Sequence, residues 1–152
     1  MGDAAKIYLA GRARVIRQDG QWIVLSRKGA ALLAYLALQG RVRRSSIASL
    51  LWPDLGEPVA RANLRELLGR LHAMVGLPAL VGGGESLQLE PSTWVDLLHD
   101  PDVDGRNLLA GHSYQDCPAL AGWIRSERDG LRGEQTTRLW EELGRCFGAV
   151  AG

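Results

Sequence analysis

Residues 51–71 constrain the fold of this chain more than any other stretch. The pair Trp52-Pro53 predicts the end of a helix, because proline cannot continue a helix and disfavours helical backbone in the residue before it. A short turn with Asp54 and Glu57 follows, and a second helix is expected to begin near Pro58, a residue tolerated in a first turn. The segment therefore predicts two helices joined by a tight turn, and the second helix carries several arginines.

The second of these helices is predicted to run to about Val75 and to be amphipathic. Apolar residues recur at intervals of three and four positions, which places them on one core stripe. They are Ala60, Leu64, Leu67, Leu68, Leu71 and Val75. The opposite face then carries Ala62, Arg65, Glu66, Gly69 and Ala73, with Arg61, Asn63, Arg70 and His72 on its flanks.

Strand patterns lie on both sides of the helical segment. Alternating apolar residues between Lys6 and Ser26 predict three short antiparallel strands, and Asp19-Gly20 is the strongest hairpin signal among them. Residues 79–81 and 86–89, on either side of a glycine-rich tip, predict a second hairpin. The expected order is therefore a strand meander, three helices and a terminal hairpin.

The remaining helix boundaries follow from capping residues. Ser26 is expected to cap the first helix, which Gly40 ends. Val42 is expected to form a one-residue bridge to the N-terminal meander. Ser45 or Ser46 is expected to cap the helix that ends at the Trp-Pro pair.

The net charge of +1 conceals an uneven distribution of charge. Residues 1–90 hold twelve Lys/Arg and seven Asp/Glu, a balance of +5, whereas residues 91–152 hold six and ten, a balance of −4. A basic first part and an acidic second part are typical of a nucleic-acid module joined to a segment that does not touch phosphates.

Composition predicts a soluble cytoplasmic protein. The 46% apolar content is enough for an ordinary core. No apolar run approaches the about 20 residues of a bilayer span, and the start lacks the apolar stretch of a secretory signal. Cys117 and Cys146 lie far apart without CxxC spacing, so we expect two free thiols and neither a disulfide framework nor a zinc cluster.

Beyond Pro91 the strand pattern is predicted to end. Trp94 to Leu98 is expected to form a short helix or an extended connector, and Pro118 to about Phe147 one or two helices. We therefore divide the chain into residues 1–91 and residues 92–152.

With these elements in order, the chain resembles bacterial transcriptional regulators that join an OmpR-type winged helix-turn-helix to a helical activator domain, the SARP-like group. The resemblance covers most of the chain, and five of its motifs illustrate it. They are Leu50-Leu-Trp-Pro-Asp, Ala60-Arg-Ala-Asn-Leu-Arg, Gly84-Glu-Ser-Leu-Gln-Leu, Trp94-Val-Asp and Gly122-Trp-Ile-Arg-Ser-Glu-Arg-Asp-Gly-Leu. The resemblance implies an α+β fold, with an N-terminal antiparallel meander, a winged helix and a small all-α segment like tetratricopeptide repeats. The activator segment is shorter here than in the family, which fits either a fragment or a truncated member.

The resemblance implies a regulator that places the helix beginning near Pro58 in the major groove of double-stranded DNA. Arg65 is then the best candidate to contact a base, because arginine pairs with guanine through two hydrogen bonds. The other expected contacts are with phosphates or lie beside them: Arg27, Lys28, Arg43, Arg44, Arg61, Arg70 and His72. Surface ion pairs of Arg61 and Arg65 with Glu57 or Glu66 remain the alternative.

Further partners follow from the same resemblance. The turn with Asp54 and Glu57 corresponds to a loop that can touch RNA polymerase, and an acidic turn that only solvates the connection is the alternative. A dimer on repeated DNA sites and a nucleoid-associated location are compatible with the family. The competing function is a winged helix that docks proteins or regulates a larger signalling protein.

Other chemistry finds little support. Residues 100–105 copy the first half of a calcium loop, but Leu108 and Gly111 stand at positions nine and twelve, where ligands are needed. The glycines at 82–84 lack the following Lys-Ser/Thr of a phosphate-binding loop. The histidines and serines form no metal or nucleophile pattern, and Trp52 and Trp94 are expected in the core. We expect no enzyme, cofactor or metal.

Overall fold

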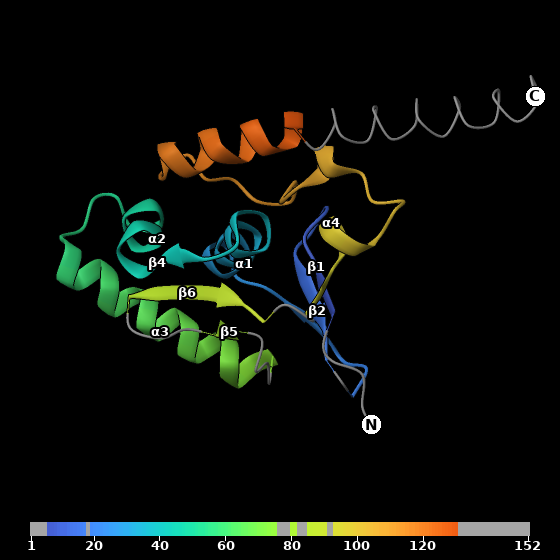
Figure 1. The fold of residues 1–152 in the computed structure, drawn as a ribbon, viewed down its shortest axis with the longest axis horizontal. Coiled ribbons are helices and arrows are strands. Elements are labelled where there is room, and N and C mark those ends of the chain that lie inside the picture. Colours follow the sequence, from blue (N-terminus) through green and yellow to red (C-terminus); the bar gives the residue numbers. More distant parts are fainter. Residues whose placement is uncertain (1–5, 18, 76–79, 82–84, 91–92, 131–152) are drawn as a thin grey trace, which may run out of the picture.

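The computed structural model describes residues 6–17, 19–75, 80–81, 85–90 and 93–130, and its fold is mixed α+β, as predicted (Figure 1). The strands are β1 (Lys6–Tyr8), β2 (Arg14–Ile16), β3 (Trp22–Val24), β4 (Val42–Arg43), β5 (Leu80–Val81), β6 (Ser86–Leu89) and β7 (Trp94–Val95). The α-helices are α1 (Arg27–Gln39), α2 (Arg44–Leu51), α3 (Glu57–Val75) and α4 (Asp96–His99), with a 3-10 turn at Gly105–Asn107. A further helix occupies residues 118–130.

The first sheet has the strand order β3-β2-β1-β7. The three predicted strands form an antiparallel meander, in which Ile7 faces Val15 and Val15 faces Ile23. At the predicted β2–β3 turn Gly20 adopts a φ of 85°, which glycine accepts without strain. The strand pattern does not end at Pro91, however, because β7 adds to the sheet parallel to β1.

The first helix follows its capping signals. Ser26 has extended backbone and its hydroxyl accepts a hydrogen bond from the Gly29 amide at 3.2 Å. At the other end Gly40 has a φ of 77°, and its N–H donates to the Leu36 carbonyl at 3.0 Å. Both predicted ends of this helix are confirmed.

The second sheet, β4-β6-β5, corrects the prediction for Val42. Val42 pairs with Leu87 of β6 and does not join the N-terminal meander. The predicted hairpin of β5 and β6 is present, with Leu80 opposite Leu89. A lone hairpin is marginally stable, and β4 supplies the third strand that it needs.

The start of α2 differs from the prediction as well. The helix begins at Arg44 and its N-cap residue is Arg43, which makes no side-chain cap hydrogen bond, so neither Ser45 nor Ser46 is the cap. The Arg44 N–H instead donates to the Glu85 carbonyl at 2.7 Å. Strand pairing therefore satisfies an amide at the helix start, and no hydroxyl is required there. The helix ends at Leu51, before Trp52, as predicted.

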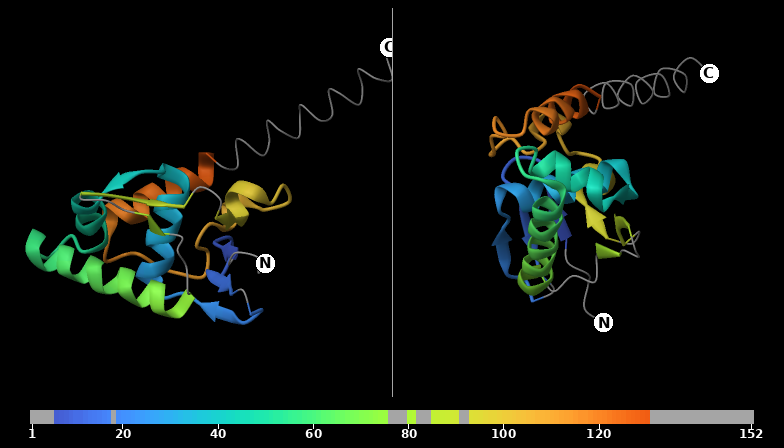
Figure 2. Two further views of the ribbon diagram at one scale, coloured as in Figure 1. Left: turned by 60° about the horizontal axis from the view of Figure 1, so that its bottom comes forward. Right: turned by 90° about the vertical axis from the view of Figure 1, so that its left-hand side faces the viewer.

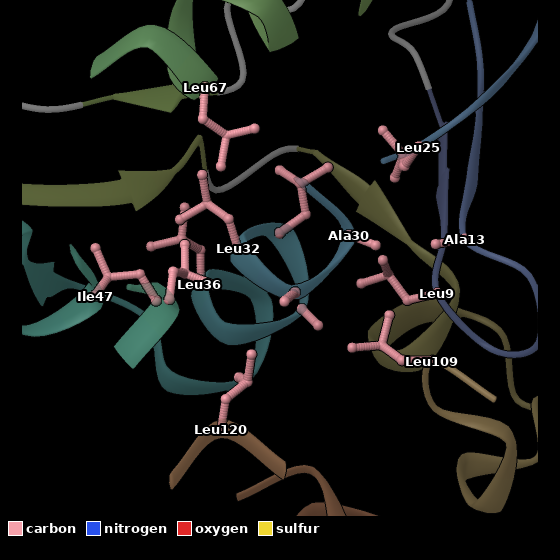
Figure 3. Packing of buried hydrophobic residues seen from close by; sticks show 14 of the residues in the cluster. Leu9, Ala13, Leu25, Ala30, Leu32, Leu36, Ile47, Leu67, Leu109 and Leu120 are labelled. Atoms are coloured by element: carbon pink, nitrogen blue, oxygen red, sulfur yellow. The ribbon is translucent and has the colours of Figure 1, made fainter. Parts of the chain in front are cut away.

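A single hydrophobic core runs through both parts of the chain. Figure 3 shows Leu67 of α3 and Leu120 of the helix at 118–130 pointing toward α1 from opposite sides, and Leu32 and Leu36 of α1 lie between them. Leu108, Leu109 and Ile124 are buried in the same cluster. The described residues before position 91 and those after position 92 thus share a core, and the division of the chain there into functional units stays a prediction.

Asp96 fastens the later segment to the first sheet. The residue is 3% exposed, and its carboxylate accepts hydrogen bonds from the amides of Leu9 at 2.9 Å, Ala10 at 3.1 Å and Leu97 at 2.7 Å. A buried carboxylate needs such donors, because without them its burial would be costly. The Trp-Val-Asp motif therefore forms a structural link between β7 and β1.

Several predictions fall outside the described residues. They concern the hairpin tip at 82–84, the side chain of Val75, Cys146 and the helix predicted to continue to about Phe147. Cys117 is a buried free thiol, as expected. In the described part of the chain, no helix is both long and apolar enough to cross a bilayer.

Candidate nucleic-acid interface

The outer face of α3 is open. In both views of Figure 2, α3 lies at the outside of the fold, and no described segment crosses its outer side. Its predicted core residues Ala60, Leu64, Leu67, Leu68 and Leu71 are buried. The five residues predicted for the opposite face are all exposed: Ala62, Arg65, Glu66, Gly69 and Ala73. The orientation predicted from the periodicity is therefore confirmed.

Arg65 stands in the first half of this exposed face. Its side chain forms no ion pair with any residue that the structure describes, although Glu66 is its neighbour in the sequence. Gly69 follows one turn later and adds no side chain above the helix surface. The exposed face of α3 is therefore a flat surface on which the Arg65 guanidinium has no ion pair with a described residue.

Arg61 is held by the segment before β6. Its guanidinium donates to both carboxylate oxygens of Glu85, at 2.9 and 3.0 Å. This contact, with smaller help from Glu57, raises the pKa of Arg61 above its usual value. The ion pair connects α3 to the hairpin, so Arg61 has a carboxylate where a phosphate contact was predicted.

Arg70 is paired within α3 itself. Its guanidinium donates to Glu66 at 2.7 Å, four residues earlier, and both side chains are more than 60% exposed. Exposed pairs of this spacing contribute only about 0.3–0.5 kcal/mol. A stronger anion can therefore displace Glu66 at little cost.

Arg27, at the start of α1, is fixed by a segment far away in the sequence. It forms two hydrogen bonds to the Asp116 carboxylate, at 2.5 and 2.7 Å, and one to the Ser113 carbonyl at 3.0 Å. The Tyr114 hydroxyl donates to the Arg27 carbonyl at 2.6 Å. The guanidinium lowers the pKa of Asp116 to about 2, and the same contact raises the pKa of Arg27.

The Lys28 side chain points toward the C-terminal end of α2. Its ammonium donates to the Leu51 carbonyl, lies 3.9 Å from the Cys117 sulfur and sits 5.0 Å from the centre of the Trp52 ring. Trp52 is half-buried against the core, in agreement with the structural role predicted for it. Lys28 thus closes the C-terminal end of α2, where cations are favoured.

The other predicted contacts are spread around the helix pair. Arg43 is exposed at the start of α2, whereas Arg44 is half-buried and its Nε has no hydrogen-bond partner among the described residues. Asp54 is exposed in the turn before α3, Glu57 is exposed as the first residue of α3 and not in the turn as predicted, and His72 is exposed near the end of the helix.

A cleft of about 400 Å³ brings three of the predicted cations together. Arg27 and Lys28 line one wall, Asn63 and Arg70 line the other, and Glu66 lies among them. No sequence pattern predicts this cleft, because its walls are more than 30 residues apart in the chain. No pattern predicts Asp116 as the partner of Arg27 either.

Comparison of the sequence with models of known protein families and with curated proteins found no match.

Proposed function

We propose that this protein binds double-stranded DNA and regulates transcription, with α3 as the helix that enters the major groove. One observation carries the proposal: the outer face of α3 is exposed along its length, and Arg65 on it has no carboxylate partner in the described part of the chain. The major groove admits an α-helix, and an arginine free of internal partners can bind the acceptors of guanine.

The arrangement around α3 supports the same reading. The five-residue connection from Trp52 to Gly56 joins α2 to α3, as in a helix-turn-helix, and the β5–β6 hairpin follows α3 in the chain. Because Arg61 pairs with Glu85 next to this hairpin, the hairpin is positioned beside the recognition helix. We interpret this order of elements as a winged helix.

Phosphate contacts are proposed for the cations on the flanks. Arg61 and Arg70 can exchange an exposed carboxylate for a phosphate, because such pairs are weak and phosphate is a strong acceptor. Arg43, exposed at the N-terminal end of α2, is placed to contribute a third contact. The sequence resemblance to SARP-like regulators supports the same assignment and adds RNA polymerase as a partner of the exposed Asp54 in the turn and Glu57 at the start of α3.

Fluorescence anisotropy on a generic labelled duplex at several salt concentrations tests the proposal. Counterion release makes phosphate-dependent binding weaken steeply as salt rises. We expect Arg65→Ala to reduce affinity, and Arg106→Ala to leave it unchanged. Arg106 is a matched control, because it is an exposed arginine paired with Asp104 in a different part of the molecule.

A second candidate function is docking of a partner protein on the same face. It is favoured by the carboxylates that hold Arg27, Arg61 and Arg70 and reduce the charge available to phosphates. Absent or salt-insensitive binding to duplex DNA, also after Glu66→Gln and Glu85→Gln, would support docking and contradict the proposed function.

A further inference from the structure

A second hollow lies on the side of the molecule away from α3. It measures about 230 Å³ and is formed by the loop at residues 112–115 and by the helix at 118–130. That helix and α3 lie on opposite sides of α1 (Figures 1 and 3). The hollow shares no lining residue with the cleft beside α3, although Ser113 and Tyr114 on its loop side contact Arg27, which lines that cleft.

The charged groups of this hollow are all cationic. Arg125 and Arg128 lie three residues apart on one face of the helix, and none of the described residues that line the hollow is an aspartate or a glutamate. The Arg128 Nε donates to the Leu108 carbonyl at 2.8 Å, which fixes the direction of its guanidinium. Neither arginine forms an ion pair with a described residue, in contrast to Arg27, Arg61, Arg70 and Arg106.

The loop side of the hollow presents further polar groups. His112 has a buried Nε2 without a hydrogen-bond partner among the described residues. Burial lowers the pKa of His112, and the positive charges of Arg12 and Arg27 lower it further. The exposed Ser113 adds a hydroxyl group.

We propose that this hollow binds a small phosphorylated ligand. Two guanidiniums on one face match the charge of a phosphate monoester, since arginine binds phosphate oxygens through two parallel hydrogen bonds. Ala121 and Ile124 provide an apolar floor for the organic part of the ligand. The volume exceeds that of a single water several-fold, since a water occupies about 30 Å³ in the liquid.

NMR titration of the full chain tests the site with two probes, inorganic phosphate and glycerol 3-phosphate, at constant ionic strength set with chloride. We expect saturable shifts at His112, Ser113, Arg125 and Arg128. Arg125→Gln is expected to raise the Kd at least about tenfold, because it removes one charge-assisted pair. Arg125 is exposed, so this variant is expected to keep the melting temperature of the unmodified protein.

Arg106→Gln is the matched control and is expected to leave the Kd unchanged, because Arg106 lies outside the hollow. Equal phosphate affinity in Arg125→Gln and the unmodified protein would overturn the proposal. A short duplex DNA gives the third arm: shifts at Arg125 and Arg128 with duplex alone, and none with either small probe, would assign the site to backbone phosphate and overturn it as well. The site does not depend on α3, so its test is independent of the proposed DNA binding.

Discussion

Arg65 and Arg27 were both predicted to contact DNA, Arg65 at a base and Arg27 at a phosphate, yet the structure gives them opposite surroundings. Arg65 projects from α3 without a partner in the described chain, whereas Arg27 is bound by Asp116 and Ser113 and lies 5.4 Å from the Tyr114 ring. The α3 face is available to a partner molecule, and the start of α1 is already occupied by the later part of the same chain. Helical periodicity reports which side chains are exposed, but it does not report which of them are already paired.

The largest effect is expected where the later segment joins the core. Leu120 is fully buried against α1, so Leu120→Ala is expected to lower the free energy of unfolding by about 2–5 kcal/mol, through lost burial and the cavity that remains. Urea unfolding followed by circular dichroism measures it. Leu55→Ala, at an exposed leucine in the turn before α3, is the control and is expected to change stability by less than about 0.5 kcal/mol. If Leu120→Ala were as stable as Leu55→Ala, residues 118–130 would not belong to the core.

The next effect concerns the open face. Arg65→Ala is expected to weaken duplex binding by about 1–3 kcal/mol, or roughly 5- to 150-fold, because it removes a paired contact to a base. Stability is expected to stay the same, since Arg65 is exposed and has no ion pair with a described residue. Anisotropy and a thermal melt on the same protein measure the two quantities. If Arg65→Ala lost stability and kept its DNA affinity, Arg65 would be a structural residue like Arg27, and the contrast between them would be wrong.

Arg27→Ala is expected to lower stability and to leave DNA affinity nearly unchanged, and its effect is expected to be smaller than that of Arg65→Ala. The side chain is about one-third exposed, so loss of its ion pair is expected to lower stability by about 1 kcal/mol or less. DNA affinity is expected to change little, because the guanidinium already has its acceptors. If this variant loses affinity as strongly as Arg65→Ala, the contact with Asp116 opens when DNA binds.

The smallest expected effect is a pH dependence of stability that comes from Asp116, the ion-pair partner of Arg27 at the start of α1. The folded pKa of Asp116 is lowered to about 2 from an unfolded value near 4, so its contribution to stability is present above about pH 4 and is lost as the pH falls toward 2. Asp116→Asn is expected to show a shallower loss of stability between pH 4 and pH 2 than the unmodified protein. Urea midpoints at each pH measure the difference. Asp54→Asn, at an exposed carboxylate in the turn before α3, is the matched control.

Local patterns predicted much of the fold because their causes are local. The core stripe of α3, the Ser26 cap and the Gly40 end depend on residues a few positions apart, and all three are present. The errors have distant causes: Val42 joins β6, and the start of α2 uses the Glu85 carbonyl in place of a serine hydroxyl. The local sequence does not encode partners some 40 residues away.

The same limit applies to the candidate site. Exposure of Arg65 and Arg70 follows from helical spacing, and the Glu66 pair follows from the i, i+4 rule. The Glu85 pair of Arg61 and the Asp116 pair of Arg27 depend on how α3 meets the hairpin and how residues 113–116 return to α1. Neither pairing has a sequence signal of its own.

Asp96 determines where this chain can be divided. A shortened protein ending at residue 91 would lose β7, and with it the carboxylate that accepts the Leu9 and Ala10 amides. Such a protein would present β1 as a bare sheet edge with unmet donors, a known route to self-association. Extending such a protein through Leu97 would keep its last strand and its aspartate, but it would still remove Leu108, Leu109 and Leu120 from the shared core.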